Sequence, residues 1–176
     1  MLRRTAVLIT LALLLGIALG VYARGKLIDG SNYRGKSKSD AASSLLQIAK
    51  EQAGKGSWEN LAVARAYYAG GRKPEGQAII DALTSKKAAG SDWMRIGEIY
   101  YDAGEWNKAK DAFDQAMKLE PKNASYFSEA GAFYNLKGER AKAEELFDRA
   151  FQLDSGEVWR TADIAGSYLG VEPHRQ

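Results

Sequence analysis

Apolar residues between positions 90 and 121 recur every three or four residues, first over one stretch and then over a second. This spacing places them on one face of each of two helices. Gly104 lies between the stretches and can take the positive φ that ends a helix. The first face comprises Trp93, Ile96, Gly97 and Tyr100, and the second comprises Ala109, Phe113 and Ala116, with Pro121 after it.

The same pattern occurs in two further copies, one on each side. The earlier copy departs from it at Asn60 and Leu83, where the other copies have an aromatic residue and an alanine, and Trp58 or Leu61 is a candidate to fill the gap at Asn60. A repeated pattern of small residues at fixed places is not expected of unrelated amphipathic helices. The later copy holds Phe127, Ala130, Gly131, Tyr134, Gly138, Ala143, Phe147 and Ala150, and the earlier one Asn60, Val63, Ala64, Tyr67, Gly71, Gly76, Ile80 and Leu83.

This order of residues resembles the tetratricopeptide repeat, a helix–turn–helix unit of about 34 residues. The resemblance implies an all-α fold, a right-handed superhelix of three repeats with flanking helices. Gly97 and Ala109 would be the small residues at the close helix crossing, with larger side chains around them. The repeats would span residues 57–89, 90–123 and 124–157.

Partial copies flank the three repeats. Ile164, Ala165 and Tyr168 match the first helix of a fourth unit, so we expect a capping helix and tail over residues 158–176. Upstream, Ala42, Leu46 and Ala49 fit the second helix of an earlier unit in the same register. We therefore expect residues 40–56 to form an N-terminal packing segment, in which residues 40–52 are the helix.

Residues 1–23 form a predicted membrane anchor or signal segment. Residues 6–22 are apolar except for Thr10 and would span about 26 Å as a helix, near the lower limit for crossing a bilayer. The run exceeds the usual signal core of about 7–15 residues, which favours a transmembrane helix in contact with lipid. The alternative is a secreted protein cleaved near Ala23, because Val21 and Ala23 are small residues suited to cleavage.

Residues 24–39 are rich in glycine, serine and basic residues, which predicts a flexible linker. The Lys and Arg residues that follow the apolar run favour a cytoplasmic repeat domain. The short basic segment before the run favours export. We prefer export, which makes the chain a single-pass membrane protein with a periplasmic, extracytoplasmic repeat domain.

The sequence lacks the motifs of an enzyme. It has no cysteine, its one histidine is His174 near the end, and no metal-ligand, nucleophile or phosphate-loop motif occurs. The net charge of +3 is spread along the chain, which disfavours nucleic-acid binding. We therefore predict a non-enzymatic protein without metal or other cofactor.

The resemblance also implies a binding site, because the first helices of tetratricopeptide repeats line a concave groove that receives a peptide or a helix of another protein. Tyr68 and Tyr101 are preferred as anchors, since Tyr67 and Tyr100 already occupy core positions. For Trp58 and Leu61, packing on the preceding helix is an open alternative. By position the groove would hold Trp58, Leu61, Arg65, Tyr68, Met94, Arg95, Glu98, Tyr101, Ser125, Ser128, Ala132 and Asn135.

These observations lead to the hypothesis of a membrane-anchored scaffold. It would dock another protein during complex assembly or quality control in a bacterial-type envelope, a context that rests on analogy with exported proteins of this layout. One alternative is self-assembly, in which the groove of one copy receives a helix of the next. Another is an accessory subunit of an envelope enzyme complex for polymer secretion or cofactor maturation.

Overall fold

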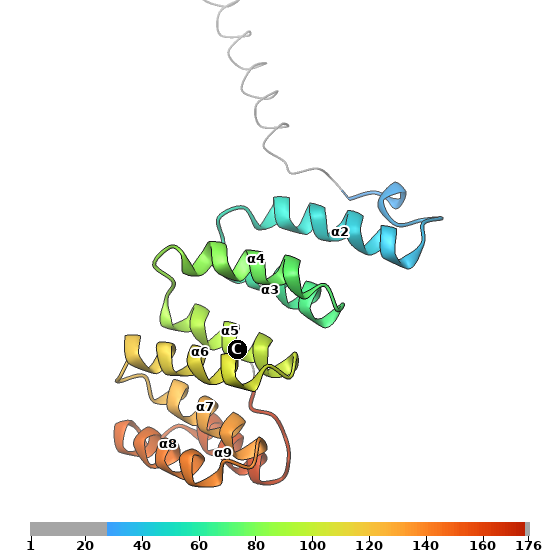
Figure 1. Ribbon diagram of the computed structural model, residues 1–176. Helices are drawn as coiled ribbons and strands as arrows, with labels where there is room; N and C mark the ends of the chain where they lie inside the picture. Colours follow the sequence, from blue (N-terminus) through green and yellow to red (C-terminus); the bar gives the residue numbers. More distant parts are fainter. Residues whose placement is uncertain (1–27, 175–176) are drawn as a thin grey trace, which may run out of the picture. The chain divides into compact units, whose positions relative to one another are not determined.

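The computed structural model describes residues 28–174 and shows eight α-helices, one turn of 3-10 helix and no strand in this part of the chain (Figure 1). The all-α prediction is confirmed for these residues. The chain divides into two units, before and after residue 56. The predicted membrane segment, residues 1–23, lies outside the described residues; none of the helices in the described part is long and apolar enough to span a bilayer.

The first unit contains η1 (Gly30–Asn32) and α2 (Lys38–Ala53). Within the predicted linker, residues 24–39, the helical parts are η1 and the first residues of α2. Polar side chains cap both elements: Asp29 accepts a hydrogen bond from the Ser31 amide at 2.8 Å, and Ser37 accepts one from the Asp40 amide at 3.1 Å. Such caps satisfy amides that have no partner within the helix.

The second unit is a series of three helical hairpins followed by one more helix. Figure 1 shows the hairpins following one another in chain order. They are α3 (Ser57–Ala69) with α4 (Lys73–Thr84), α5 (Gly90–Asp102) with α6 (Trp106–Leu119), and α7 (Ala124–Leu136) with α8 (Arg140–Leu153), and the last helix is α9 (Val158–Tyr168).

The turn inside each hairpin has the same construction. Gly71, Gly104 and Gly138 have φ of 76°, 73° and 80°, a region that L side chains rarely adopt. In the second hairpin the amide after the glycine, that of Glu105, donates to the Tyr100 carbonyl at 2.8 Å. This bond satisfies a carbonyl at the helix end and confirms the predicted role of Gly104.

The helices of each hairpin cross where the sequence places small residues. A Cβ on Gly97 would lie 2.3 Å from a ring carbon of Phe113, and a Cβ on Gly131 would lie 2.6 Å from the ring of Phe147. Ala109 is fully buried. The predicted close crossing in the second hairpin is therefore confirmed, because any larger residue at Gly97 would displace the aromatic ring.

Aromatic rings join the second hairpin to the third. Phe113 and Phe133 stack with centroids 5.2 Å apart, and Trp106 meets Tyr134 edge-on at 5.0 Å. At the end of the chain, α9 packs against α7. Each hairpin thus presents its first helix to a neighbouring first helix, and this arrangement positions the candidate site.

Candidate functional site

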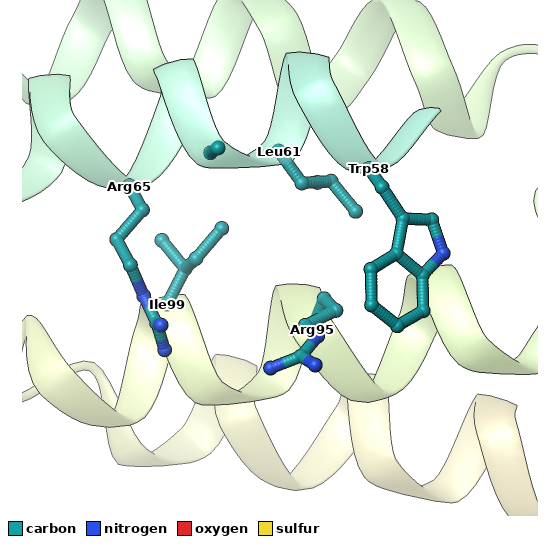
Figure 2. A pocket seen from close by; sticks show the side chains of 6 residues that line it. Trp58, Leu61, Arg65, Arg95 and Ile99 are labelled. Atoms are coloured by element: carbon teal, nitrogen blue, oxygen red, sulfur yellow. The ribbon is translucent and has the colours of Figure 1, made fainter. Parts of the chain in front are cut away.

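Two neighbouring pockets open along the first helices of the hairpins. The first, here called the Trp58 pocket, has a volume of about 290 Å³ and lies between α3 and α5 (Figure 2). The second, the Glu98 pocket, has a volume of about 210 Å³ and lies between α5 and α7. Trp58 and Arg95 line both. The Trp58 pocket is lined by Trp58, Leu61, Ala62, Arg65, Arg95 and Ile99, and the Glu98 pocket by Trp58, Ser91, Met94, Arg95, Glu98, Asn123, Ser125, Tyr126 and Glu129.

Trp58 is an exposed aromatic side chain at the edge of the first pocket. Its exposed fraction is 48%, whereas the pocket residues Leu61 and Ile99 are 3% and 2% exposed. Figure 2 shows the indole of Trp58 extending from α3 toward Arg95 on α5. The Arg95 guanidinium carbon lies 4.7 Å from the ring centroid, a cation–π contact that holds the indole at the pocket edge.

A buried carboxylate lies between two guanidinium groups beside the pocket. Glu98 is 1% exposed, and its Oε2 lies 2.9 Å from Arg65 Nη2 and 3.1 Å from Arg95 Nη1. Arg65 also pairs with Asp102 at 3.2 Å. These ion pairs satisfy a charge that would otherwise be costly to bury, and they fix both arginine side chains at the pocket.

The Glu98 pocket brings a second carboxyl group close to the first. Burial, and then the neighbouring carboxylate of Glu98, raise the pKa of Glu129 well above its ordinary value of 4.5, and Arg95 opposes this shift. Two carboxyl groups in one site favour retention of a proton on one of them. Tyr126 lines the same pocket, and burial followed by the nearby Glu120 carboxylate raises its pKa to about 12.

The structure brings most of the predicted groove residues of the first two repeats together. Trp58, Leu61, Arg65 and Arg95 line the first pocket, and Met94, Arg95, Glu98 and Ser125 line the second. Leu61 faces the pocket shared with α5, and Trp58 extends forward onto α5 through its contact with Arg95.

Tyr68 and Tyr101 lie elsewhere, which corrects the expectation that they are the preferred anchors. Tyr68 is 5% exposed, and its hydroxyl donates to Gln77 on α4. The ring of Tyr101 packs 4.5 Å from that of Phe133 and beneath the ammonium group of Lys137. Both rings are engaged between successive hairpins, and neither is among the residues that line the Trp58 pocket or the Glu98 pocket.

Apart from Ser125, the predicted residues of the third repeat are buried or contact α9. Ser128 and Ala132 are buried, and the side-chain amide of Asn135 donates to the Ser167 hydroxyl of α9 at 3.0 Å. The candidate site is therefore confined to the first helices of the first two repeats and the beginning of the third. Among the residues that sequence reasoning missed is Ile99, the apolar residue directly after Glu98 on α5.

The residues that line the pockets indicate what the pockets could bind. In the part of the chain that the structure describes, no group of three or more His, Cys, Asp or Glu residues could hold a metal ion. What the first pocket offers is an apolar cavity with an aromatic edge and two guanidinium groups. This composition suits insertion of an apolar side chain, with polar contacts at the rim.

Part of the chain matches a known protein family. Residues 91–123, which include α5 and α6, match the model of the tetratricopeptide repeat family. This match supports the resemblance at the second hairpin, and repeats of this family generally mediate protein–protein interactions. A comparison with curated proteins finds no match to the chain.

Proposed function

We propose that this chain is a docking scaffold that binds a segment of another protein at the Trp58 pocket. The observation that carries the proposal is the exposed indole of Trp58 beside the buried side chains of Leu61 and Ile99. Tryptophan and arginine are the residue types most often found at energetically dominant positions of interfaces. The indole is held by Arg95 before any partner arrives, which lowers the entropy lost on binding.

The size of the pocket indicates the kind of ligand. At about 290 Å³ it falls at the lower end of the range for small-molecule sites, so one apolar side chain of a peptide or helix fits it better than a whole cofactor. Beside it, Arg65 and Arg95 are already paired with Glu98. A strongly acidic ligand would have to compete with this internal carboxylate, so we favour a partner whose anchor residue is apolar.

The experiment is site-specific photo-crosslinking in cells with the full chain. A crosslinker replaces Ala62, an exposed residue of the Trp58 pocket, and the control carries it at Lys118, an exposed residue of α6. We expect one foreign protein to be trapped from Ala62 and lost when Trp58→Ala is added. Equal trapping from Lys118, trapping that survives Trp58→Ala, or capture of this chain alone would overturn the proposal.

The membrane part of the proposal rests on residues 6–22, which carry no charged side chain. They would hold the scaffold at a bilayer with the repeat domain in the periplasm, where it serves assembly or quality control of envelope complexes. Carbonate extraction of membranes tests the anchor, because an uncleaved span stays with the lipid. Protease added to intact spheroplasts tests orientation, since a periplasmic repeat domain is digested and a cytoplasmic one is protected.

A further inference from the structure

Two helices of the chain, α2 and α9, each correspond to one half of a repeat hairpin. In the repeat register α9 corresponds to a first helix, with Ala165 and Tyr168 where the second repeat has Gly97 and Tyr100. By the same register α2 corresponds to a second helix, with Ala42, Leu46 and Ala49 at the positions of Ala109, Phe113 and Ala116. Within residues 28–174, α9 is therefore a first helix with no second helix after it, and α2 is a second helix with no first helix before it.

The open face of α9 is the one that a second helix would cover. The tail lies on another side of the helix, where the Val171 and His174 amides bond to Gly166 and Asp163. The uncovered stripe includes Leu169 at 82% exposure and Tyr168 at 47%, whereas Tyr100 and Tyr134 are buried in complete hairpins. Its members are Val158, Thr161, Ala165, Tyr168 and Leu169, all exposed and spaced to share one helix face.

The matching positions of α2 are also incompletely covered. Ala42 is exposed, and Leu46 and Ala49 are partly exposed. Their counterparts in the complete hairpins are buried: Ala109, Phe113 and Ala116 in α6, and Ala143, Phe147 and Ala150 in α8. In a complete hairpin, the residues at the positions that correspond to these exposed residues of α2 and α9 contact each other.

The two ends also differ in charge. Residues 28–56 contain five Lys or Arg and three Asp or Glu, and residues 140–174 contain four Lys or Arg and seven Asp or Glu. A basic N-terminal end and an acidic C-terminal end attract one another when they belong to different copies. Like ends repel, which disfavours a symmetric contact between two C-terminal ends.

We propose that a second copy of this chain covers α9, with its α2 completing the missing hairpin. The contact is head-to-tail, because the surface given by one copy differs from the surface given by the other. Repetition of such a contact produces a ring or a filament. The association is independent of the Trp58 pocket and adds an assembly mode that uses α2 and α9.

Because the chain contains no cysteine, engineered cysteines report on this contact without background. In the first hairpin the corresponding positions touch: a Cβ on Gly76 would lie 2.9 Å from the Ala64 carbonyl oxygen. Ala42→Cys in one copy and Ala165→Cys in another should therefore come within disulfide distance. The two full-length variants, purified separately in detergent, are mixed and oxidised mildly.

We expect the mixture to form several-fold more disulfide-linked dimer than Ala42→Cys mixed with Ala141→Cys, an exposed position on α8. Trp58→Ala should leave this yield unchanged, which separates failure of the docking pocket from failure of the assembly. Ala165→Glu should lower the mass measured by sedimentation equilibrium with the melting temperature unchanged. Equal yields in both mixtures, or one concentration-independent monomer mass for the unmodified chain, would overturn the proposal.

Discussion

Arg65 on α3 and Glu98 on α5 form an ion pair between successive repeats, with Arg65 Nη2 2.9 Å from Glu98 Oε2. The two residues are 33 positions apart, close to one repeat length. Arg95 pairs with the same oxygen at 3.1 Å and also contacts the indole of Trp58. The buried carboxylate therefore links the packing of two first helices to the position of the exposed ring.

Removing both arginines should destabilise the protein strongly. In Arg65→Met/Arg95→Met the carboxylate of Glu98 loses both cations, and an uncompensated buried charge costs about 3–5 kcal/mol of unfolding free energy. Adding Glu98→Met should recover much of this loss, because the charge then disappears. Urea denaturation of the full chain measures both effects, and a triple variant no more stable than the double would contradict the interpretation.

The raised pKa of Glu129 predicts that the stability of the protein depends on pH. Because its pKa is raised in the folded state, the folded protein keeps a proton that the unfolded chain releases above about pH 4.5. Stability should fall as pH rises from 4.5 toward the raised pKa, with a slope of up to about 1.4 kcal/mol per pH unit. Glu129→Gln should abolish this slope, whereas Glu59→Gln at an exposed position should retain it in thermal melts across pH.

Gly97→Ala should cost about 1–3 kcal/mol, because the added Cβ would lie 2.3 Å from the Phe113 ring and overpack the crossing. Gly166→Ala is the matched control. Its Cβ would meet nothing closer than 3.6 Å, and alanine favours a helix over glycine by about 1 kcal/mol. Chemical denaturation should give opposite signs for the two variants, and a neutral Gly97→Ala would count against the crossing.

Gln77 satisfies two buried phenol groups at once. Tyr68 donates to its Oε1 at 2.5 Å, and its Nε2 donates to the Tyr100 hydroxyl at 2.9 Å. Gln77→Leu leaves both hydroxyls without this partner and should cost about 1–3 kcal/mol. Tyr68→Phe in the same background should cost less than it does alone, and a double-mutant cycle that is strictly additive would argue against the network.

The hairpins, their turn glycines and the crossing at Gly97 could be predicted because each depends on contacts within about 30 residues and leaves a periodic signal. The contact between the two helices of the first hairpin could not be predicted in the same way. There Gly76 meets the ring of Tyr68, where the second repeat pairs Gly97 with Phe113. The ring that meets the glycine thus comes from the first helix in the first repeat and from the second helix in the second repeat, a difference that the repeat pattern does not indicate.

The groove was predicted less well than the core. Assigning Tyr68 to it assumed that a residue beside a core position faces outward. A helical step of 100° instead carries this side chain into the contact with the next hairpin, where it meets Tyr100 at 5.8 Å. The proximity of the Glu98 and Glu129 carboxyl groups could not be predicted either. The two residues lie on different helices, and the distance between them depends on the angle between successive hairpins, which the sequence does not show.

In the second unit, elements with substantial contacts are immediate or next-but-one neighbours along the chain. Among the described residues of this unit, no distant segment makes substantial contacts across the series of hairpins, so a force applied at one end is not distributed over all of them. Mechanical pulling on α9 should therefore unfold this unit one hairpin at a time. The force–extension curve should show a series of small force peaks, and the hairpins should refold readily when the force is released. A helical unit built this way extends under load as a spring does and recovers its length when the load is removed.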